Sequence, residues 1–358
     1  MALPQPAFWQ GRRVFLTGHT GFKGGWLALW LERLGAAVEG YALAPESSPS
    51  TFEELGVARH LGRSRIADVR DRDELLRAVA AARPEVVFHL AAQPLVLRGY
   101  QQPVETFATN VMGTVHLLEA VRQVGSAKAV VVVTTDKVYA ENDDDAPFRE
   151  GDRLGGVEPY GGSKAAAEIV VETYRAAYFA AAGVALASAR AGNVIGGGDE
   201  SEARLVPDVV RALRAGQTLT LRNPSATRPW QHVLDPLAGY LVLAEHLFGA
   251  GAERYARAWN FGPGSACVAT VEDVVARVQG AWGQRVPSVR SDGPREASRL
   301  ALDASAATAE LGWIPRLGLD EAIDWTVAWY RRVHDGESGE RLALDQLERY
   351  TASATAAR

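Results

Sequence analysis

Cysteine is almost absent from this chain of 358 residues, which contains only Cys267. One cysteine cannot form an internal disulfide or a multi-cysteine zinc site, and this scarcity is typical of proteins that work in a reducing cytosol. We interpret Cys267 as a small buried hydrophobic residue. No other pattern in the chain predicts a metal site.

A surplus of positive charge is also lacking, because the formal net charge is −5 and acidic and basic residues are interspersed. A nucleic-acid footprint would need basic residues gathered on one face. The N-terminal segment MALPQPAFWQGRR has no apolar signal-like region, and the most apolar stretch, 169–189, carries Glu172 and Arg175. We therefore expect a cytoplasmic protein with neither a nucleic-acid nor a membrane partner.

Short β-branched runs alternate with longer helical patterns from Arg13 to about Arg190. Continuous apolar strands separated by helices indicate a doubly wound, parallel α/β sheet covered on both faces. Ligands of such sheets bind at the C-terminal ends of the strands. The predicted strands are 14–17, 38–42, 86–90, 130–134 and 185–189, and the predicted helices are 23–34, 71–82, 104–124 and 163–182.

The pattern becomes irregular after Arg190, where glycines and prolines cluster between helical stretches at 271–282, 304–311 and 319–332. We assign residues 1–190 to the first domain. Residues 191–345 are expected to form a smaller lobe with segments that cross back to that domain. Residues 346–358 are expected to be a flexible tail.

A glycine-rich turn, TGHTGFKG, follows the first predicted strand and leads directly into a helix. The G-x-x-G-x-x-G spacing lets the backbone approach a pyrophosphate, which a helix N-terminus stabilises. Lys23 fits a phosphate contact and a solvated side chain equally well. The end of the second strand has neither the acidic residue typical of NAD sites nor an arginine for the 2′-phosphate of NADP. Charge at this position therefore does not distinguish NAD from NADP.

Residues after Ile66-Ala67 and at the end of the third predicted strand, 86–90, extend this cofactor site. Asp68 is placed to approach the adenine, and small residues after the strand 86–90 let a cofactor pass closely. The predicted cofactor contacts are Thr17, Gly18, His19, Gly21, Phe22, Lys23, Gly24, Asp68, Val69, Leu90, Ala91, Ala92, Gln93, Asn110, Thr134, Tyr160 and Lys164.

Tyr160 and Lys164 are one helical turn apart, a spacing that suits a phenolic acid/base supported by an ammonium group. A free tyrosine titrates near pH 10, so a positive lysine and a positive nicotinamide ring are needed to favour its phenolate. Tyr160 would then remove a hydroxyl proton from the substrate, and Lys164 would also bind the nicotinamide ribose. The hydroxyl of Thr135 is expected to hold the substrate oxygen.

Asp136 and Lys137 follow Thr135 directly and distinguish between reactions. A simple reductase or 4-epimerase needs only the hydroxyl, tyrosine and lysine groups. An extra acid/base pair suggests that one proton is removed and another group is expelled. The alternative, a strand-end carboxylate beside a solvated lysine, is about equally compatible with the spacing alone.

Seven segments together resemble the CDP-glucose 4,6-dehydratase family, a group of sugar-nucleotide dehydratases within the extended short-chain dehydrogenases/reductases. The resemblance runs from about Trp9 to Tyr330. GHTGFKG, TTDK and RPWQHV are its narrowest motifs. The segments are TGHTGFKG, HLAAQPLV, TFATNVMGTVHLLEAVR, TTDKVY, PYGGSKAAAE, ARAGNVIGGGD and RPWQHVLDPLAGYL.

The resemblance implies a Rossmann domain with a smaller substrate-binding lobe, NAD as cofactor and CDP-glucose as substrate. It implies oxidation at carbon 4 with Tyr160 as base, loss of water across carbons 5 and 6, and hydride return to carbon 6. It also implies Asp136 as the acid and Lys137 as the carbon-5 base, where related dTDP-glucose enzymes carry glutamate. Lys137 can act as a base only if its environment lowers its pKa.

The resemblance also implies a substrate site in the second lobe, where arginines suit a diphosphate. Trp230 fits core packing nearly as well as base stacking, and His232 fits a structural role first. The chain departs from the family pattern at Gly99, Gly161, Glu200, Ser201 and Arg295, which leaves the nucleotide preference open. The implied substrate contacts are Gln93, Asn193, Arg204, Leu205, Arg228, Gln231, His232 and Arg295.

Other interpretations stay open at this stage: a dehydratase or epimerase for a dTDP-, UDP- or GDP-sugar, or a non-catalytic, cofactor-sensing protein of the same fold. The resemblance further implies a homodimer, or a dimer of dimers, through the helices 104–124 and 163–182. Small residues in the second helix would permit close approach: Ala165, Ala166, Ala167, Ala176 and Ala177.

Overall fold

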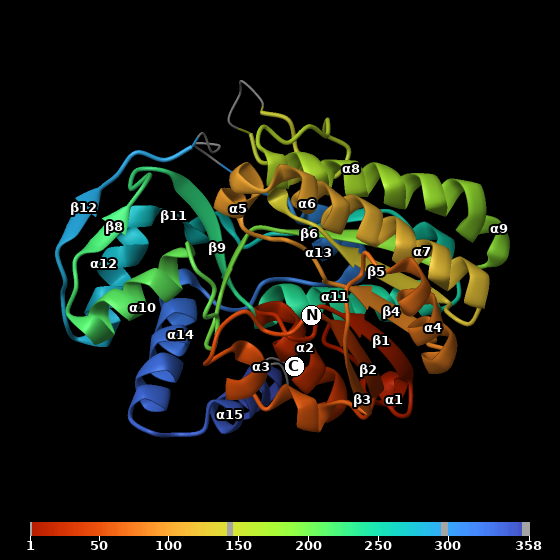
Figure 1. Ribbon diagram of the computed structural model, residues 1–358, viewed down its shortest axis with the longest axis horizontal. Helices are drawn as coiled ribbons and strands as arrows, with labels where there is room; N and C mark the ends of the chain where they lie inside the picture. The colour runs from red at the N-terminus through yellow and green to blue at the C-terminus, as the bar shows by residue number, and fades with distance from the viewer. Residues whose placement is uncertain (1, 142–145, 295–299, 353–358) are drawn as a thin grey trace.

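The computed structural model describes residues 2–141, 146–294 and 300–352 (Figure 1). Within these residues the main sheet has seven strands in the order β10-β6-β5-β4-β1-β2-β3, and every neighbouring pair is parallel. The strands are β1 (Arg13–Thr17), β2 (Ala37–Ala42), β3 (Arg63–Ile66), β4 (Val86–His89), β5 (Ala129–Val133), β6 (Ala185–Ala191) and β10 (Ala258–Phe261).

Helices cover both faces of this sheet (Figure 1). On one face, α2 (Phe22–Arg33) packs against β1 and α11 (Leu234–Phe248) packs against β5 and β6, and both helices share one hydrophobic cluster with Val14 and Leu16. On the other face, Phe15 of β1 packs with the buried sides of α4 (Arg72–Ala82), α7 (Gly113–Val124) and α8 (Pro159–Tyr174). Successive residues of one strand thus serve opposite layers, as the pleat requires. The predicted doubly wound parallel sheet is confirmed.

Two strands of the sheet were not predicted. The sequence of β3 is polar because the strand lies at the sheet edge, where its residues are only partly buried. The opposite edge strand, β10, has four residues and lies far beyond Arg190 in the chain, so it is a segment of the second half that crosses back to the first domain. The five predicted strands are present, with ends that differ by one or two residues.

Two long predicted helices are interrupted by π-helical turns. The segment 104–124 contains α6 (Pro103–Phe107), a π-turn (Ala108–Met112) and α7. The segment 163–182 begins earlier than predicted, at Pro159, and continues as α8, a π-turn (Arg175–Phe179) and α9 (Ala180–Ala182). The earlier start matters because it places Tyr160 and Lys164 on the same helix.

The second half of the chain forms two small sheets and several helices beside the main sheet. β7 (Asn193–Ile195), β9 (Thr227–His232) and β11 (Val268–Thr270) form one sheet, and β8 (Leu219–Leu221) pairs with β12 (Ser288–Arg290). The helices there are α10 (Leu205–Ala215), α12 (Val271–Trp282), α13 (Ser305–Leu311) and α14 (Leu319–His334). The three helices predicted after residue 270 are thus present, whereas α10 and α11 were not predicted.

The prediction of a flexible tail is wrong for residues 346–352, because they belong to the helix α15 (Gly339–Ala352). Tyr350 is 1% exposed, and its hydroxyl donates a hydrogen bond to Asp235 over 2.8 Å. Residues 353–358 lie outside the described residues. The remaining short helices are α1 (Pro6–Trp9), α3 (Thr51–Glu54) and α5 (Val96–Gln101).

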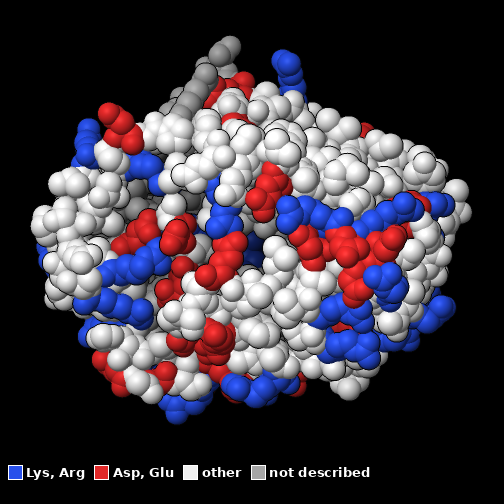
Figure 2. All heavy atoms as spheres, viewed as in Figure 1, with Lys and Arg blue, Asp and Glu red and all other residues white. Residues whose placement is uncertain are grey.

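Acidic and basic side chains alternate over the face shown in Figure 2. Within the described part of the chain, each helix is too short or too polar to cross a membrane. Among the same residues, no group of three or more histidine, cysteine, aspartate or glutamate side chains is placed to hold a metal ion.

Candidate active site

A cavity of about 460 Å³ lies at the carboxyl ends of the central strands, bordered on its other side by β7, α10 and β9. The sequence-based expectation that the chemistry lies after β1 and β5 agrees with this position. The predicted site residues that line it are Gly18, Gly21, Phe22, Lys23, Gly24, Asp68, Val69, Leu90, Ala91, Ala92, Thr134, Thr135, Asp136, Lys137, Tyr160, Lys164, Asn193, Arg204, Leu205 and Arg228.

The glycine turn fits a dinucleotide because its backbone is packed too closely for side chains. Gly18 has φ of +81°, and an added Cβ there would lie 2.7 Å from the amide nitrogen of Ala91. An added Cβ on Gly24 would lie 2.0 Å from the carbonyl oxygen of Gly18, so α2 begins directly against the turn. The N-terminus of α2 therefore opens onto the cavity, where it can stabilise a pyrophosphate.

Four residues predicted to contact the cofactor support the cavity wall from behind. Thr17 Oγ1 lies 2.7 Å from His89 Nδ1 and accepts a hydrogen bond from the amide of Ala91. The ring of His19 is buried under Gly40, and its Nε2 lies 2.8 Å from Ser64 Oγ. Both side chains form hydrogen bonds inside the protein, so they hold the turn in place and do not face the cavity.

Gln93 and Asn110 form the rest of this supporting layer. The Gln93 amide donates to Thr106 Oγ1 over 2.8 Å, and its side-chain oxygen accepts from the backbone of Leu95 over 2.6 Å. Asn110 bonds both the backbone NH and the carbonyl of Gln93, at 2.9 and 3.0 Å. Both the nitrogen and the oxygen of the Gln93 amide are bonded inside the protein, and the side chain does not line the cavity. This position does not support the predicted substrate contact.

The segment Thr135-Asp136-Lys137 turns sharply at the end of β5, and a short 3₁₀-helix (Asp136–Val138) places its side chains in the cavity. Thr135 Oγ1 donates to Asp136 Oδ1 over 3.0 Å. The other carboxylate oxygen of Asp136 is buried and has no hydrogen-bond partner among the described residues. Burial raises the pKa of Asp136 against the opposing charges of Lys137, Arg228 and Lys23. A carboxyl group with a raised pKa suits a general acid.

Tyr160 and Lys164 project from the first two turns of α8. The side chain of Glu158 caps the helix by accepting the amide hydrogens of Tyr160 and Gly161, each over 2.7 Å. Lys164 Nζ donates to the carbonyl of Val133 over 3.0 Å, which fixes it beside the end of β5. Burial lowers the pKa of Lys164 to about 8, although the charge of Glu168 opposes this change.

The pKa of Tyr160 differs from the sequence-based expectation. Burial raises it to about 12, against a hydrogen bond with Thr135 and the charge of Arg204. The protein's own groups therefore keep the phenol protonated at neutral pH, and Lys164 alone does not favour the phenolate. A positive ring beside Tyr160, as the nicotinamide of NAD⁺ carries, would supply the missing stabilisation.

Lysine is rare in this chain, which has four lysines and 34 arginines, yet three of the four lysines line the cavity. These are Lys23, Lys137 and Lys164. Burial lowers the pKa of Lys23 to about 7, helped by the charges of Arg204 and Lys164 and opposed by Asp136. Because a buried lysine changes its protonation state readily and arginine does not, Lys23 and Lys164 are amines suited to proton transfer. Lys23 lines the cavity and is partly buried there, a position compatible with the predicted phosphate contact.

Gly161 and Gly99 explain two departures from the family pattern. An added Cβ on Gly161 would lie 2.7 Å from the carbonyl oxygen of Lys137 and 2.9 Å from Glu158 Oε1. An added Cβ on Gly99 would lie 3.2 Å from the amide nitrogen of Tyr160. The glycines thus allow the turn that carries Lys137 and the helix α5 to pack against the start of α8.

Replacing Gly161 with alanine is expected to lower both the melting temperature and the turnover. The new methyl group would press on the turn at Lys137, and such overpacking typically costs about 1–3 kcal/mol. Gly162→Ala is the matched control, because an added Cβ there meets its nearest atoms at 3.7 Å. Alanine is also the better helix former, so this control should melt at the same or a higher temperature. Equal melting temperatures and rates for the two variants would contradict the close packing.

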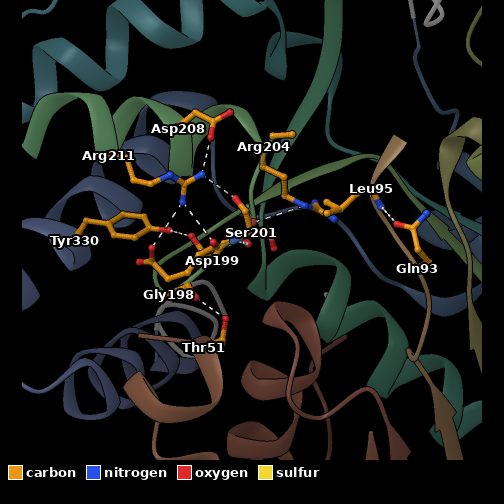
Figure 3. A network of polar contacts seen from close by, with 12 residues as sticks. Thr51, Gln93, Leu95, Gly198, Asp199, Ser201, Arg204, Asp208, Arg211 and Tyr330 are labelled. Atoms are coloured by element: carbon orange, nitrogen blue, oxygen red, sulfur yellow. Dashed lines mark hydrogen bonds and ion pairs between the residues drawn. The ribbon is translucent and has the colours of Figure 1, made fainter. Parts of the chain in front are cut away.

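A charged network fixes the loop that forms the far wall of the cavity (Figure 3). The guanidinium of Arg211 bonds Asp208 and the carbonyls of Glu200 and Ser201. The hydroxyl of Tyr330 donates to the carbonyl of Asp199 over 2.6 Å. The backbone of Glu200 and Ser201, two of the positions that depart from the resembled pattern, thus anchors the loop.

Three arginines reach the cavity from this side. Arg204 precedes α10, with its Nε 3.9 Å from Asp199 Oδ2. Arg228 lies on β9 and is 5% exposed. Arg222 was not predicted; it follows β8 and donates to the carbonyl of Ala203 over 3.3 Å. The turn signal Arg222-Asn223-Pro224 just before RPWQH could have drawn attention to it.

Two predicted substrate contacts on β9 do not line the cavity. Gln231 points the other way and donates to the carbonyl of Phe261 over 2.9 Å. His232 is buried between the rings of Trp26 and Trp325, and burial lowers its pKa to about 3, which supports the structural role. Trp230 both lines the cavity and donates to the carbonyl of Ala269 over 3.1 Å. Arg295 lies outside the described residues.

Comparison with known proteins gives one family model and several relatives. The model described as GDP-mannose 4,6 dehydratase matches residues 15–326. The CDP-glucose 4,6-dehydratase of Salmonella typhimurium is 47% identical over 356 residues, which cover 97% of this chain and 98% of that protein. The UDP-glucose 4-epimerase of Mycolicibacterium smegmatis is 30% identical and covers 89% of this chain and 98% of its own.

A solved structure also resembles this one. The dTDP-glucose 4,6-dehydratase DesIV from Streptomyces venezuelae, solved with NAD bound, superimposes with a TM-score of 0.77 and 26% sequence identity. The match covers 89% of this chain and 97% of DesIV.

Proposed function

This chain belongs to the GDP-mannose 4,6-dehydratase family of NAD-dependent hydro-lyases with the extended short-chain dehydrogenase/reductase fold, and we propose that it converts CDP-glucose to CDP-4-keto-6-deoxyglucose. The observation that carries the proposal is the position of Asp136 and Lys137 beside Tyr160 in one cavity. An epimerase has no use for this second acid/base pair. The choice of CDP rests on the 47% identity to the Salmonella enzyme.

The proposed reaction divides the proton transfers among the cavity residues. Tyr160 accepts the proton of the carbon-4 hydroxyl, whose oxygen Thr135 holds. Lys137 then removes the proton on carbon 5, which the new 4-ketone has made acidic. Asp136 protonates the hydroxyl that leaves carbon 6 as water. Bound NAD would supply the uptake of hydride from carbon 4 and its return to carbon 6. Lys137 returns a proton to carbon 5, and the proton gained by Tyr160 balances the one given up by Asp136, so the net change is the loss of one water.

The glycine turn and the residues after β3 and β4 fit NAD. Gly18, Gly21 and Gly24 provide backbone that can approach a pyrophosphate, and Leu90–Ala92 leave room beside it. Asp68 lines the cavity, but its carboxylate is paired with the guanidinium of Arg70 over 2.8 Å. We therefore infer that Asp68 supports the adenine site with its backbone or together with Arg70.

Arginines suit the diphosphate of a nucleotide sugar because a planar guanidinium can pair with two phosphate oxygens. We infer that Arg204, Arg222 and Arg228 hold this group, because all three line the cavity from segments of the second half of the chain. Asn193, at the start of β7, and Leu205 are proposed to complete the substrate wall.

The test is incubation of the purified protein with CDP-glucose and NAD⁺, followed by mass spectrometry and alkaline absorbance of the product. Loss of one water without net formation of NADH would support the proposal. Turnover of only a dTDP-, UDP- or GDP-sugar would overturn the CDP assignment and keep the dehydration. Interconversion of sugar epimers without loss of water would overturn the dehydration, and silence with all four would favour the non-catalytic interpretation.

We also propose that two chains associate through α6, α7 and α8. Two of these helices, α6 and α8, carry large apolar side chains at the surface, where Val104 is 82% and Ile169 57% exposed. Exposed apolar patches of this kind mark protein interfaces. Others on the same helices and their π-turns are Phe107, Met112 and Tyr178. Of the small residues predicted to pack between chains, Ala165 and Ala167 are instead buried within the protein itself.

Replacing Ile169 with glutamate is expected to convert the protein from at least a dimer to a single chain, because a charge would be buried without a partner. Light scattering at micromolar concentration checks the mass. Val289→Glu is the control, since Val289 is 51% exposed on β12 in the other lobe. A wild-type protein that is already a single chain would refute the interface. A dimer of dimers would show four chain masses.

We propose a cytoplasmic location, because the one cysteine, Cys267, is a free and buried thiol that suits a reducing compartment. Recovery of the protein in the membrane or secreted fraction of its host would contradict this.

A further inference from the structure

A buried ion pair lies directly behind the active-site residues. Glu168 of α8 and Arg190 of β6 are joined over 2.8 Å between Oε2 and Nη2, and each side chain is 4% exposed. Neither residue lines the cavity, and neither was predicted as part of the site. A buried pair is weak evidence for stability, because the loss of hydration offsets most of the attraction. Its position therefore calls for another explanation.

The pair is connected to the start of the catalytic segment. Glu168 Oε1 accepts a hydrogen bond from Thr134 Oγ1, and Oε2 also accepts from Ser188 Oγ over 2.6 Å. Thr134 immediately precedes Thr135, Asp136 and Lys137. Burial by itself would raise the pKa of Glu168, but Arg190, Ser188 and Thr134 lower it overall, so the carboxylate is charged. Glu168 thus brings a fixed negative charge to the end of β5.

Arg190 extends the same network away from the cavity. Its Nη1 donates to the hydroxyl of Tyr139 over 2.8 Å and to the carbonyl of Glu150 over 3.0 Å. Tyr139 in turn donates to Asn260 of β10 over 2.7 Å. The arginine is therefore held on several sides, and it cannot leave Glu168 without breaking these bonds.

Lys164 is four residues before Glu168, so the two side chains lie on the same face of α8. Glu168 is the charged group that opposes the lowering of the Lys164 pKa by burial. The other ionisable groups near Lys164 are His89 of β4, Lys23 of α2 and Tyr160 of its own helix. Burial lowers the pKa of His89 to about 3, so this histidine is neutral, and Lys23 can only repel a positive Lys164.

We propose that Glu168 is a positioning residue of the active site: held by Arg190, it fixes Thr134 at the start of the catalytic segment and places a negative charge one helical turn from Lys164. The proposal rests on the proposed function, in which a positive Lys164 is needed while Tyr160 gives up and regains its proton. It differs from a purely structural role, because the charge of Glu168, and not only its shape, is required.

The small number of lysines makes a direct test feasible. Protein labelled with ¹³C at the lysine ε-carbons gives four signals, which Lys23→Met, Lys128→Met and Lys137→Met variants assign by elimination. The pH titration of the Lys164 signal is then followed without cofactor or substrate, so its result does not depend on the substrate assignment. In Glu168→Gln the proton of Lys164 should be lost at a pH lower by about one unit or more than in the wild type.

The activity should follow the same shift. Because Lys164 loses its proton as pH rises, the decline of kcat on the alkaline side should move to lower pH in Glu168→Gln. Glu348→Gln, on the exposed side of α15 and outside the proposed dimer helices, is the control and should leave both curves unchanged. Glu168→Asp keeps the charge and should restore most of the Lys164 titration.

A folded Glu168→Gln protein whose Lys164 titrates as in the wild type would overturn the proposal. If that variant does not fold because Arg190 is left without an anion, the double variant Glu168→Gln/Arg190→Met removes both charges. It must then show the lowered Lys164 titration, and a wild-type titration there would equally overturn the proposal. An altered titration without turnover of any nucleotide sugar would keep this inference and reject the proposed function.

Discussion

Replacing Tyr160 with phenylalanine is expected to lower kcat for the proposed dehydration by about 10²–10⁴-fold, the usual contribution of a general acid or base. The ring is 9% exposed, so phenylalanine keeps the packing and removes only the hydroxyl. Oxidation at carbon 4 is the step that needs this hydroxyl. The variant should therefore form no reduced NAD in a single turnover, which the near-ultraviolet absorbance of NADH would reveal.

Binding of NAD⁺ and the melting temperature serve as controls for this variant. Both should stay close to the wild-type values, because Lys164 remains bonded to Val133 and the glycine turn is untouched. A rate within tenfold of the wild type would mean that another group, such as Lys23, accepts the proton.

Replacing Lys137 with methionine should block the reaction one step later. Oxidation at carbon 4 should proceed, but removal of the carbon-5 proton should slow by about 10²–10⁴-fold. Reduced NAD should then accumulate in the presence of substrate, whereas the wild-type enzyme should show little of it. Exchange of the carbon-5 hydrogen with deuterated water, followed by mass spectrometry, measures the affected step directly.

Lys128→Met is the matched control for Lys137→Met, because Lys128 is the one lysine of the four that does not line the cavity. It should turn over at the wild-type rate. Full activity in Lys137→Met would reject Lys137 as base. If carbon-5 hydrogen exchange is normal but loss of water is slow, Lys137 would instead be the acid and Asp136 the base.

The two variants together separate the two proposed steps, oxidation at carbon 4 and removal of the carbon-5 proton. Tyr160→Phe tests the hydroxyl that all dehydrogenases of this fold would need. Lys137→Met tests the residue that separates a dehydratase from an epimerase. Their effects should differ in whether NADH appears, a distinction that a general loss of folding could not produce.

The sequence alone did not show which side chains of β9 face the cavity. Arg228 and Trp230 line the cavity, and Gln231 between Trp230 and His232 faces β10. Successive residues of a strand point to opposite faces, so Gln231 could not share a side with its neighbour. The sequence pattern suggested the whole run as a site because it does not show where the strand begins or which face meets the substrate.

Burial is the second feature that depends on the tertiary structure. The sequence predicted that Lys164 would favour the phenolate of Tyr160, yet burial raises the pKa of Tyr160 to about 12 and lowers that of Lys164 to about 8. The size of a desolvation effect depends on how many atoms exclude water from a group. Those atoms come from segments far apart in the chain, and no local motif records them.

The sequence by itself determined the five central strands, the glycine turn, the segment Thr134–Lys137 and the Tyr160–Lys164 pair, because each is a local pattern whose spacing has a direct structural meaning. The tertiary structure alone decided that β10 joins the sheet, that Arg222 reaches the cavity, that Gln93 and Gln231 turn away from it, and that Glu168 meets Arg190 behind it. These contacts join residues widely separated in the chain. They form only when the layers pack, because burial and pairing are properties of the whole fold.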